Sequence, residues 1–313
     1  MGDIHFSIAL EKGSNNLVNA TDVKNGKECN CYCASCGEDL VAVNKGIVQR
    51  PHFRHNKESE CPFSQSYESY IHWLAKAVIL NLDTIQLPPI YIADLNFYKE
   101  LHKQLVNKVK NLLKTHGLLK DFDEDKIHFY DLLLQPARVI DIQDCSLEKL
   151  YQTKLGNIVV DAVLKTGNHY LFIEPFYTNP VTTSKLEKLK EIEVSTISID
   201  LVEFINRHNF YFSKEVFTEY IKSDIKSKKW IFIRKSKVDQ LIDKLFTSKV
   251  ERNISLLKQR MPENEAIKEQ IDTMTNDLNI LDQQYYVSRK KIIDNIEKLQ
   301  NQLYLVKPSD LFN

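Results

Sequence analysis

The segment Ile158–Phe176 reads IVVDAVLKTGNHYLFIEPF. Two runs of β-branched and aromatic residues flank Lys165–Asn168, and this arrangement is typical of two strands joined by a hairpin turn. Asp161 stands inside the first run and Glu174 inside the second. Because a carboxylate in a buried strand is costly unless it is paired or binds a cation, the two acids are expected to converge on one divalent ion.

The segments around this hairpin predict an α/β core with one crossover connection. Val139–Ile142 and Val194–Ile199 have the β-branched character of strands, and Thr183–Ile192 has the spacing of a short amphipathic helix. The resulting order is strand, strand, strand, helix, strand. Further helices are expected over Ser66–Leu82 and Phe97–Leu113.

Three polar residues of the first expected helix follow one another at four-residue intervals: Glu68, His72 and Lys76. Side chains at this spacing lie on one face of a helix. One interpretation is that they belong to the same site as the two acids. The alternative is a solvated polar stripe, since the charged face of an amphipathic helix usually lies in water.

Five of the six cysteines precede position 62. Cys33 and Cys36, followed by Gly37, have the spacing of a zinc knuckle, in which two thiolates bind one ion. A second pair of ligands must come from downstream, and His55 and Cys61 are the favoured residues.

The remaining ligand candidates are His52 and Cys31, which the spacing leaves open as alternatives. Four protein ligands would close the site, so the expected Zn²⁺ is structural rather than catalytic. Phe53 is expected to pack the small core beside it. The competing interpretation is a set of free buried cysteines.

The composition favours a folded protein without a membrane anchor. The chain has 313 residues, 43% of them hydrophobic, and a formal net charge of zero, which argues against a histone-like nucleic-acid binder. No apolar run approaches the ~20 residues of a membrane helix, and no signal peptide is visible, so a cytoplasmic location is expected. Lys214–Arg260 holds 13 basic and 6 acidic residues, which suits either a solvated helical surface or a phosphate-binding patch.

The C-terminal region from Lys214 onward is expected to be helical. Apolar positions from Ile271 to Leu299 follow alternating steps of three and four residues, as in a coiled coil. Pro262 is expected to break the helix before this seam. Such a seam would form a homodimer or bind a partner protein, and the alternative is a helical hairpin folded on its own chain.

Several of these motifs together resemble one protein family. They are Cys31-Tyr-Cys33-Ala-Ser-Cys36-Gly37, Arg50-Pro-His52-Phe53-Arg-His55, Cys61, Glu68-Ser69, His72, Leu74-Ala75-Lys76, Asp161, Glu174-Pro-Phe176-Tyr-Thr178-Asn179, Lys185, Lys188 and Lys229-Trp230-Ile231. With them, residues 1 to about 235 resemble the competence protein CoiA-like nucleases. The resemblance implies an α/β, restriction-endonuclease-like PD-(D/E)XK core with an N-terminal β-rich zinc module. The expected regions are 1–65 for this module, 66–212 for the core and 213–313 for the helical tail.

The resemblance further implies that Asp161 and Glu174 hold Mg²⁺ or Mn²⁺ and that Glu68 is an additional acidic residue. The family's signature lysine lies two residues after the second acid, where this chain has Phe176. Lys185 or Lys76 would take its place. The implied activity is cleavage of DNA, either during uptake of foreign DNA or in defence against phage.

Two other functions compete with a nuclease. The zinc module and a degenerate core could bind nucleic acid without cleaving it, or the tail could make the chain an interaction subunit. The sequence has no Gly-rich phosphate loop and no Gly-x-Ser-x-Gly elbow, which argues against nucleotide hydrolysis and acyl transfer.

Overall fold

The computed structural model describes residues 6–33, 36–56, 61, 67–95, 97–118, 129, 131–208, 211–280 and 286–303, with the backbone alone at 67–69, 248, 261, 279–280 and 286–289. These residues form two compact units. The first comprises Met1–Ile90 and Gln135–Lys237, and the second comprises Tyr91–Leu134 and Val238–Asn313.

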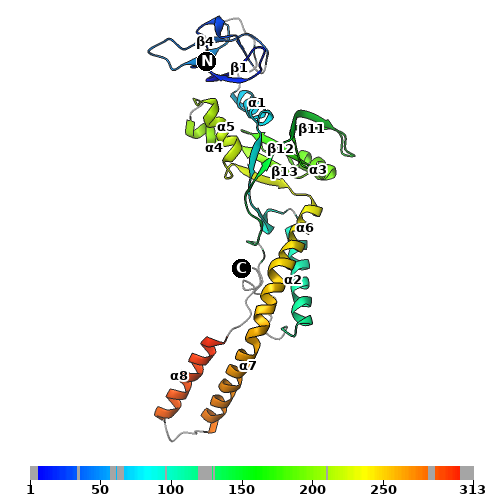
Figure 1. Cartoon of the computed structure of the whole chain (residues 1–313), viewed down its shortest axis with the longest axis vertical. Coiled ribbons are helices and arrows are strands. Elements are labelled where there is room, and N and C mark those ends of the chain that lie inside the picture. The colour runs from blue at the N-terminus through cyan, green and yellow to red at the C-terminus, as the bar shows by residue number, and fades with distance from the viewer. Residues whose placement is uncertain are drawn as a thin grey trace. The chain divides into compact units, whose positions relative to one another are not determined.

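The N-terminal part of the first unit is rich in short strands, as expected (Figure 1). A three-stranded sheet has the order β2 (Leu17–Asn19), β1 (Ile8–Glu11), β3 (Cys31–Tyr32), and a short 3-10 helix, η1 (Lys27–Cys29), precedes β3. A separate hairpin pairs β4 (Val41–Val43) with β5 (His52–Arg54). Phe53 in the middle of β5 is fully buried, so its predicted role in the small core is confirmed.

The core of the first unit is a five-stranded mixed sheet. Its order is β10 (Asp144–Tyr151), β11 (Ile158–Thr166), β12 (His169–Phe176), β13 (Thr196–Asp200) and β14 (Lys228–Phe232). All neighbours are antiparallel except β12 and β13, which are parallel and joined through α3 (Thr183–Ile192). The predicted hairpin, crossover helix and following strand are confirmed, and the fold class is mixed α/β.

Three details of the expected core are wrong. The strand expected at 139–142 is β9 (Arg138–Asp141), which pairs with β6 (Thr84–Leu87) outside the main sheet. The sheet instead takes its first strand from β10, in which no residue is fully buried and which therefore lacks a strong apolar pattern. Its last strand, β14, lies in a region expected to be wholly helical, because the partner strand β13 stabilises an extended conformation there.

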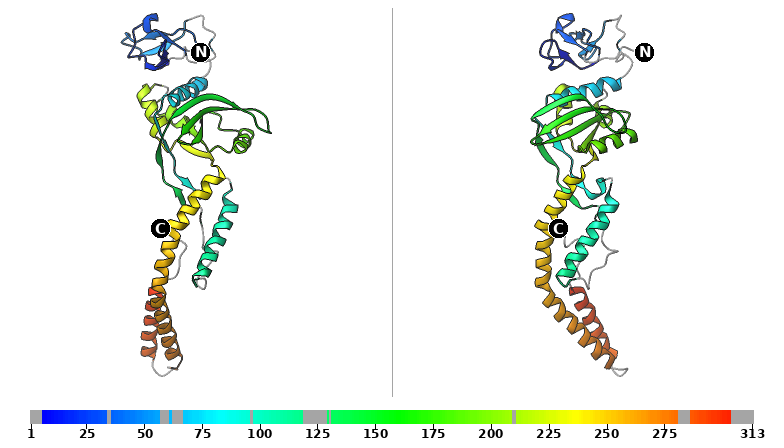
Figure 2. Two further views of the ribbon diagram at one scale, coloured as in Figure 1. Left: turned by 45° about the vertical axis from the view of Figure 1, so that its right-hand side comes forward. Right: turned by 90° about the vertical axis from the view of Figure 1, so that its right-hand side faces the viewer.

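Helices cover both faces of this sheet (Figure 2). Alternate residues of the strands, such as Ala162 and Ile173, pack with α1 (Tyr67–Leu80), α4 (Val202–His208) and α5 (Lys214–Ser223). Their neighbours Val163 and Phe172 pack on the other face with Leu189 of α3. This division follows from the two-residue period of a strand.

The second unit is mainly helical. It contains α2 (Tyr98–Thr115), most of α6 (Lys235–Leu245), the π-helical turn η6 (Phe246–Val250), α7 (Glu251–Ile280) and α8 (Tyr286–Gln302). Three short elements occur at or next to the points where the sequence passes from one unit to the other: β7 (Ile90–Tyr91), η3 (Ile92–Asp94) and β8 (Leu133–Gln135). Among the described residues, no helix combines the length and apolarity needed to cross a bilayer.

The expected coiled-coil seam is divided between two helices that contact each other, α7 and α8. The described tail is therefore a helical hairpin rather than one continuous helix. Pro262 does not end a helix as predicted but lies inside α7. A proline in a helix interior removes one hydrogen bond and bends the helix, and Figure 2 shows α7 bent along its length.

Candidate functional site

Asp161 and Glu174 lie directly opposite each other on neighbouring strands. The β11–β12 ladder ends at the pair Ala162 and Ile173, and the same register places Asp161 next to Glu174. The Asp161 N–H donates to Glu174 Oε1 at 3.5 Å. Directly opposed residues of an antiparallel pair project from the same face, so the predicted convergence of the two acids is present.

Pro175 gives a physical reason why the ladder ends at this point. The N–H of Phe172 donates to Ser195 on the side of β13, at 3.0 Å. Since peptide groups alternate along a strand, the nitrogen at position 175 faces β11. Proline has no N–H to continue that ladder, so the pairing of β11 with β12 ends at this point.

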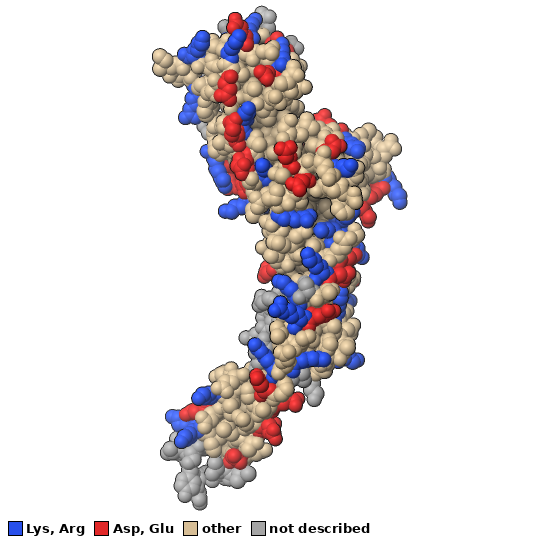
Figure 3. Space-filling view, viewed as in Figure 1, with Lys and Arg blue, Asp and Glu red and all other residues tan. Residues whose placement is uncertain are grey.

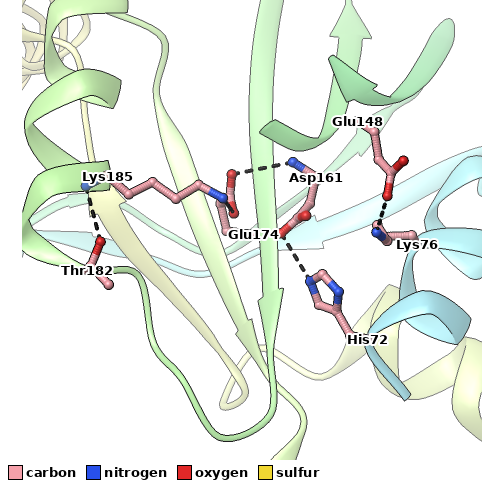
Figure 4. A network of polar contacts seen from close by, with 7 residues as sticks. All are labelled: His72, Lys76, Glu148, Asp161, Glu174, Thr182 and Lys185. Atoms are coloured by element: carbon pink, nitrogen blue, oxygen red, sulfur yellow. Dashed lines mark hydrogen bonds and ion pairs between the residues drawn. The ribbon is translucent and has the colours of Figure 1, made fainter. Parts of the chain in front are cut away.

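Two basic side chains meet the acid pair from different helices (Figure 4). Lys185 Nζ of α3 contacts Glu174 Oε2. His72 Nε2 of α1 lies 3.1 Å from Asp161 Oδ2. The hydroxyl of Thr182, at the N-cap of α3, accepts from the backbone N–H of Lys185 at 3.2 Å and so fixes the start of the helix that carries this lysine. Sequence reasoning missed Thr182, although a threonine just before a helix is a recognised capping signal.

The acid pair lies in a pocket of about 420 Å³. Its charged part consists of His72, Asp161, Glu174 and Lys185, and its remaining wall is the segment that follows Glu174, namely Pro175, Phe176, Tyr177, Asn179, Pro180, Val181 and Thr182. The sequence motif Glu174–Asn179 therefore lines one cavity, with the exception of Thr178.

The two acids have opposite pKa shifts. Burial raises the pKa of Asp161, but hydrogen bonds from His72 and Glu174 and the charges of His72 and Lys185 outweigh burial and lower it to about 2. Burial and the neighbouring Asp161 raise the pKa of Glu174 to about 8. The pair therefore holds close to one negative charge at neutral pH, as expected for two carboxyl groups that share one site.

A pH-dependent stability follows for the protein without added divalent cation. Since the folded pKa of Glu174 is raised from 4.5 to about 8, its stabilising contribution is complete below pH 4.5 and is lost as pH rises through 8. Glu174→Gln, which resembles the protonated acid, should gain stability over the wild type between about pH 5 and about pH 9, on the order of a few kcal/mol. Urea unfolding of both proteins at the two pH values measures the difference in their free energies of unfolding. If that difference is the same at both pH values, the assigned pKa shift of Glu174 is contradicted.

The other residues predicted on α1 have different positions. Lys76, 7% exposed, donates to Glu148 Oε1 of β10 at 2.6 Å and does not line the pocket. Glu68 lies on α1 one turn before His72, and its side chain lies outside the described residues. Glu148, which sequence reasoning missed, has the left-handed φ of 51° within a strand and occupies the position opposite Asp161 in the β10–β11 register.

The predicted zinc ligands come together in the N-terminal part. One ligand atom each of Cys33, Cys36, His55 and Cys61 lies within 4.8 Å of all the others. The Sγ atoms of Cys33 and Cys61 are 3.9 Å apart, and Cys36 Sγ is 3.5 Å from His55 Nε2. Such separations suit a tetrahedral ion with ligands at about 2.0–2.3 Å. The Cys₃His cluster could hold a structural metal such as zinc.

The alternative ligands make other contacts. Cys31 Sγ donates to the backbone carbonyl of Cys29 at 3.0 Å, and His52 Nδ1 lies 2.8 Å from the carbonyl oxygen of Arg50. The favoured set of four ligands is therefore the one that the fold assembles.

Comparisons with known proteins bear on the N-terminal part alone. Residues 4–63 match a family model described as a domain of unknown function (DUF7828), and this range includes all four residues of the Cys₃His cluster. No curated protein and no solved structure matches the chain.

Proposed function

We propose that this chain is a metal-dependent nuclease that hydrolyses phosphodiester bonds of DNA, with Asp161 and Glu174 as ligands of Mg²⁺ or Mn²⁺. The observation that carries the proposal is the opposed acid pair on β11 and β12, which opens into a pocket that also contains Lys185. The hairpin, crossover helix and parallel strand that frame the pair agree with the PD-(D/E)XK core that the sequence resemblance implies.

The donor set fits a hard divalent cation. Both acids offer only oxygen ligands, which Mg²⁺ and Mn²⁺ prefer. Glu174 is 2% exposed, and its ionised form is disfavoured by burial and by Asp161. A cation between the two carboxylates would relieve that repulsion, and without one the ammonium group of Lys185 contacts Glu174.

The chain's own residues would hold and orient the reactants. A bound divalent ion would lower the pKa of a water molecule and stabilise negative charge on the phosphate. Asp161 is ionised at neutral pH, and Glu174 must lose its proton to act as a ligand. His72, hydrogen-bonded to Asp161, would fix the orientation of that carboxylate. Glu68, one turn earlier on α1, is proposed as the additional acidic residue.

Lys185 is proposed to replace the signature lysine of the family. Phe176 occupies the usual position and has no charge, whereas Lys185 Nζ already reaches the carboxylate of Glu174. When a cation binds the carboxylate of Glu174, the ammonium group of Lys185 would leave that carboxylate and could contact the phosphate. Lys76 is the weaker candidate, because Glu148 on β10 pairs with it.

Lys185→Met is expected to lower the rate of DNA cleavage by about 10²-fold, because a positive group beside the reacting phosphate is lost. Lys188→Met is the matched control: Lys188 lies on the same helix, and its Nζ donates to the carbonyl of Asn157, away from the pocket. Initial rates with saturating Mn²⁺ measure both variants. Equal rates for Lys185→Met and the wild type would remove Lys185 from the proposed chemistry.

The general test is cleavage by the purified chain of plasmid, linear and single-stranded DNA, with Mg²⁺, Mn²⁺ or a chelator. Cleavage that depends on the added metal supports the proposal, and the preferred DNA form defines the substrate. Absence of cleavage under every condition would contradict it. The proposed setting is the bacterial cytoplasm, in handling of foreign DNA or in antiviral defence.

One observation favours a second function, in which the chain binds nucleic acid without cleaving it. Lys185 contacts Glu174 and His72 contacts Asp161, so each acid has a polar partner without a metal. In this case the α7–α8 hairpin would bind a partner protein or a second copy of the chain. Metal-independent DNA binding with no cleavage would distinguish this function from a nuclease.

A further inference from the structure

The loop between β4 and β5, residues 44–51, carries two unusually exposed apolar side chains. Ile47 is 102% exposed and Val48 is 97% exposed, whereas the next large apolar side chain among the described residues, Val139, is 61% exposed. Isolated apolar residues on a surface are common, but two adjacent ones that touch almost nothing are not. Figure 1 shows the loop beyond β4 projecting from the N-terminal part.

The base of this loop is held by a specific set of hydrogen bonds. The Asn44 N–H donates to Asn25 Oδ1 at 3.0 Å, and Asn44 Nδ2 donates to the carbonyls of Ala20 and Val23, both at 2.7 Å. At the other end, His52 Nδ1 lies 2.8 Å from the carbonyl oxygen of Arg50. The projection is therefore built on the fixed N-terminal fold, which reduces the entropy lost when its tip binds a partner.

The charged residues of the loop and its two flanking strands have one sign. Residues 40–56 contain Lys45, Arg50 and Arg54 and no Asp or Glu. The guanidinium of Arg50 lies over the ring of Tyr211 at 4.8 Å, so its position is fixed. Figure 3 shows an uncharged tip with Lys and Arg side chains next to it, and Asp and Glu side chains elsewhere on the N-terminal part. A polyanion is the partner that complements an apolar tip between cations.

We propose that this loop contacts duplex DNA in the minor groove, where Ile47 and Val48 insert between base pairs and Lys45 and Arg50 contact the flanking phosphates. Apolar wedges with neighbouring basic residues are used in this way by proteins that kink DNA. Isoleucine and valine have few side-chain rotamers, so burying them loses little entropy. The inference rests on the proposed function for the choice of DNA as the partner, but it does not require cleavage.

The test measures binding of the full chain to a short fluorescein-labelled duplex that carries 2-aminopurine, without added divalent cation. Wild-type binding should raise 2-aminopurine fluorescence, because a wedge unstacks the base. The double variant Ile47→Ser, Val48→Ser should bind about 10-fold or more weakly and lose the fluorescence rise. Lys45→Ala should weaken binding less and lower the salt slope by about 1.

Val139→Ser is the matched control, since it removes an exposed β-branched side chain elsewhere in the first unit. It should bind as the wild type does, and equal zinc content and circular dichroism would show that each variant is folded. Unchanged affinity of the Ile47, Val48 double variant overturns the inference. It is overturned as well if the wild type does not bind duplex DNA, or binds only vesicles of phosphatidylglycerol through this tip.

The binding test and the cleavage assay together separate this inference from the proposed nuclease. If the double variant binds normally while Mn²⁺-dependent cleavage still requires Asp161, the proposed insertion of the loop into DNA is wrong and the proposed nuclease activity is supported. If binding depends on Ile47 and Val48 but no metal supports cleavage, the insertion of the loop into DNA is supported and the proposed nuclease activity is wrong.

Discussion

Replacing Asp161 with alanine is expected to reduce metal-dependent DNA cleavage by about 10³-fold or more, because it removes one of the two proposed metal ligands and with it the charge that holds the ion. The fold should remain intact. Glu174 keeps its contact with Lys185 and loses the repulsion of a neighbouring carboxylate. Initial rates on supercoiled plasmid in Mn²⁺ measure the effect, and urea unfolding measures the stability.

Two further variants make this result specific. Asp161→Asn preserves the size of the side chain and should lose nearly as much activity, since an amide is a weak metal ligand. Asp141→Ala removes an exposed acid on β9 and should retain wild-type rates. Robust cleavage by both Asp161 variants would show that the acid pair is not the catalytic site.

Replacing Cys61 with serine is expected to remove bound zinc and to unfold the N-terminal part of the first unit. Cys61 is 1% exposed and belongs to the four-residue cluster. Structural zinc contributes roughly 10 kcal/mol or more to the folding of small zinc domains, and the strands here have only two to four residues each. Elemental analysis should find one zinc per wild-type chain and none in the variant, which limited proteolysis should cut within this part.

Cys145→Ser and Cys31→Ser are the controls for the cluster. Cys145 lies on β10 and Cys31 on β3, and neither belongs to the four-residue set. Both variants should keep their zinc. Loss of zinc in Cys31→Ser would move the ligand assignment to the alternative that the sequence left open, and a wild-type chain without zinc would contradict the metal centre itself.

The N-terminal part contacts α1, which carries His72 of the proposed active site, and also contacts α5. Tyr70 of α1 donates its hydroxyl hydrogen to the carbonyl of Ile8 at 3.0 Å and packs its ring on Phe6. Asn19 Oδ1 accepts from the backbone N–H of Lys214 at the start of α5, at 2.7 Å. Since α1 also carries His72, loss of zinc should disturb the residue that orients Asp161.

The parts of the fold that the sequence predicts well are those with strong local patterns. Apolar runs on both sides of Lys165–Asn168 predict the hairpin of β11 and β12. The periodicity of apolar residues predicts the helix Thr183–Ile192. The Cys₃His cluster was predictable because thiol and imidazole side chains in a turn-rich segment have few other uses.

The parts that the sequence does not predict depend on contacts between distant residues. Strand β10 has no fully buried residue and is stabilised by its pairing with β11, and β14 is extended because it pairs with β13. Lys185 was the first candidate in the sequence and Lys76 the second. The packing of α1 and α3 against the sheet decides between them, since it brings Lys76 to Glu148 and Lys185 to Glu174.

Diffraction from crystals soaked in Mn²⁺, recorded at a wavelength where manganese scatters anomalously, tests the central claim directly. We expect one anomalous peak between the carboxylates of Asp161 and Glu174, about 2.0–2.2 Å from an oxygen of each, with Lys185 displaced from Glu174. Crystals without a peak there, in which Lys185 still contacts Glu174, would contradict the proposed metal site.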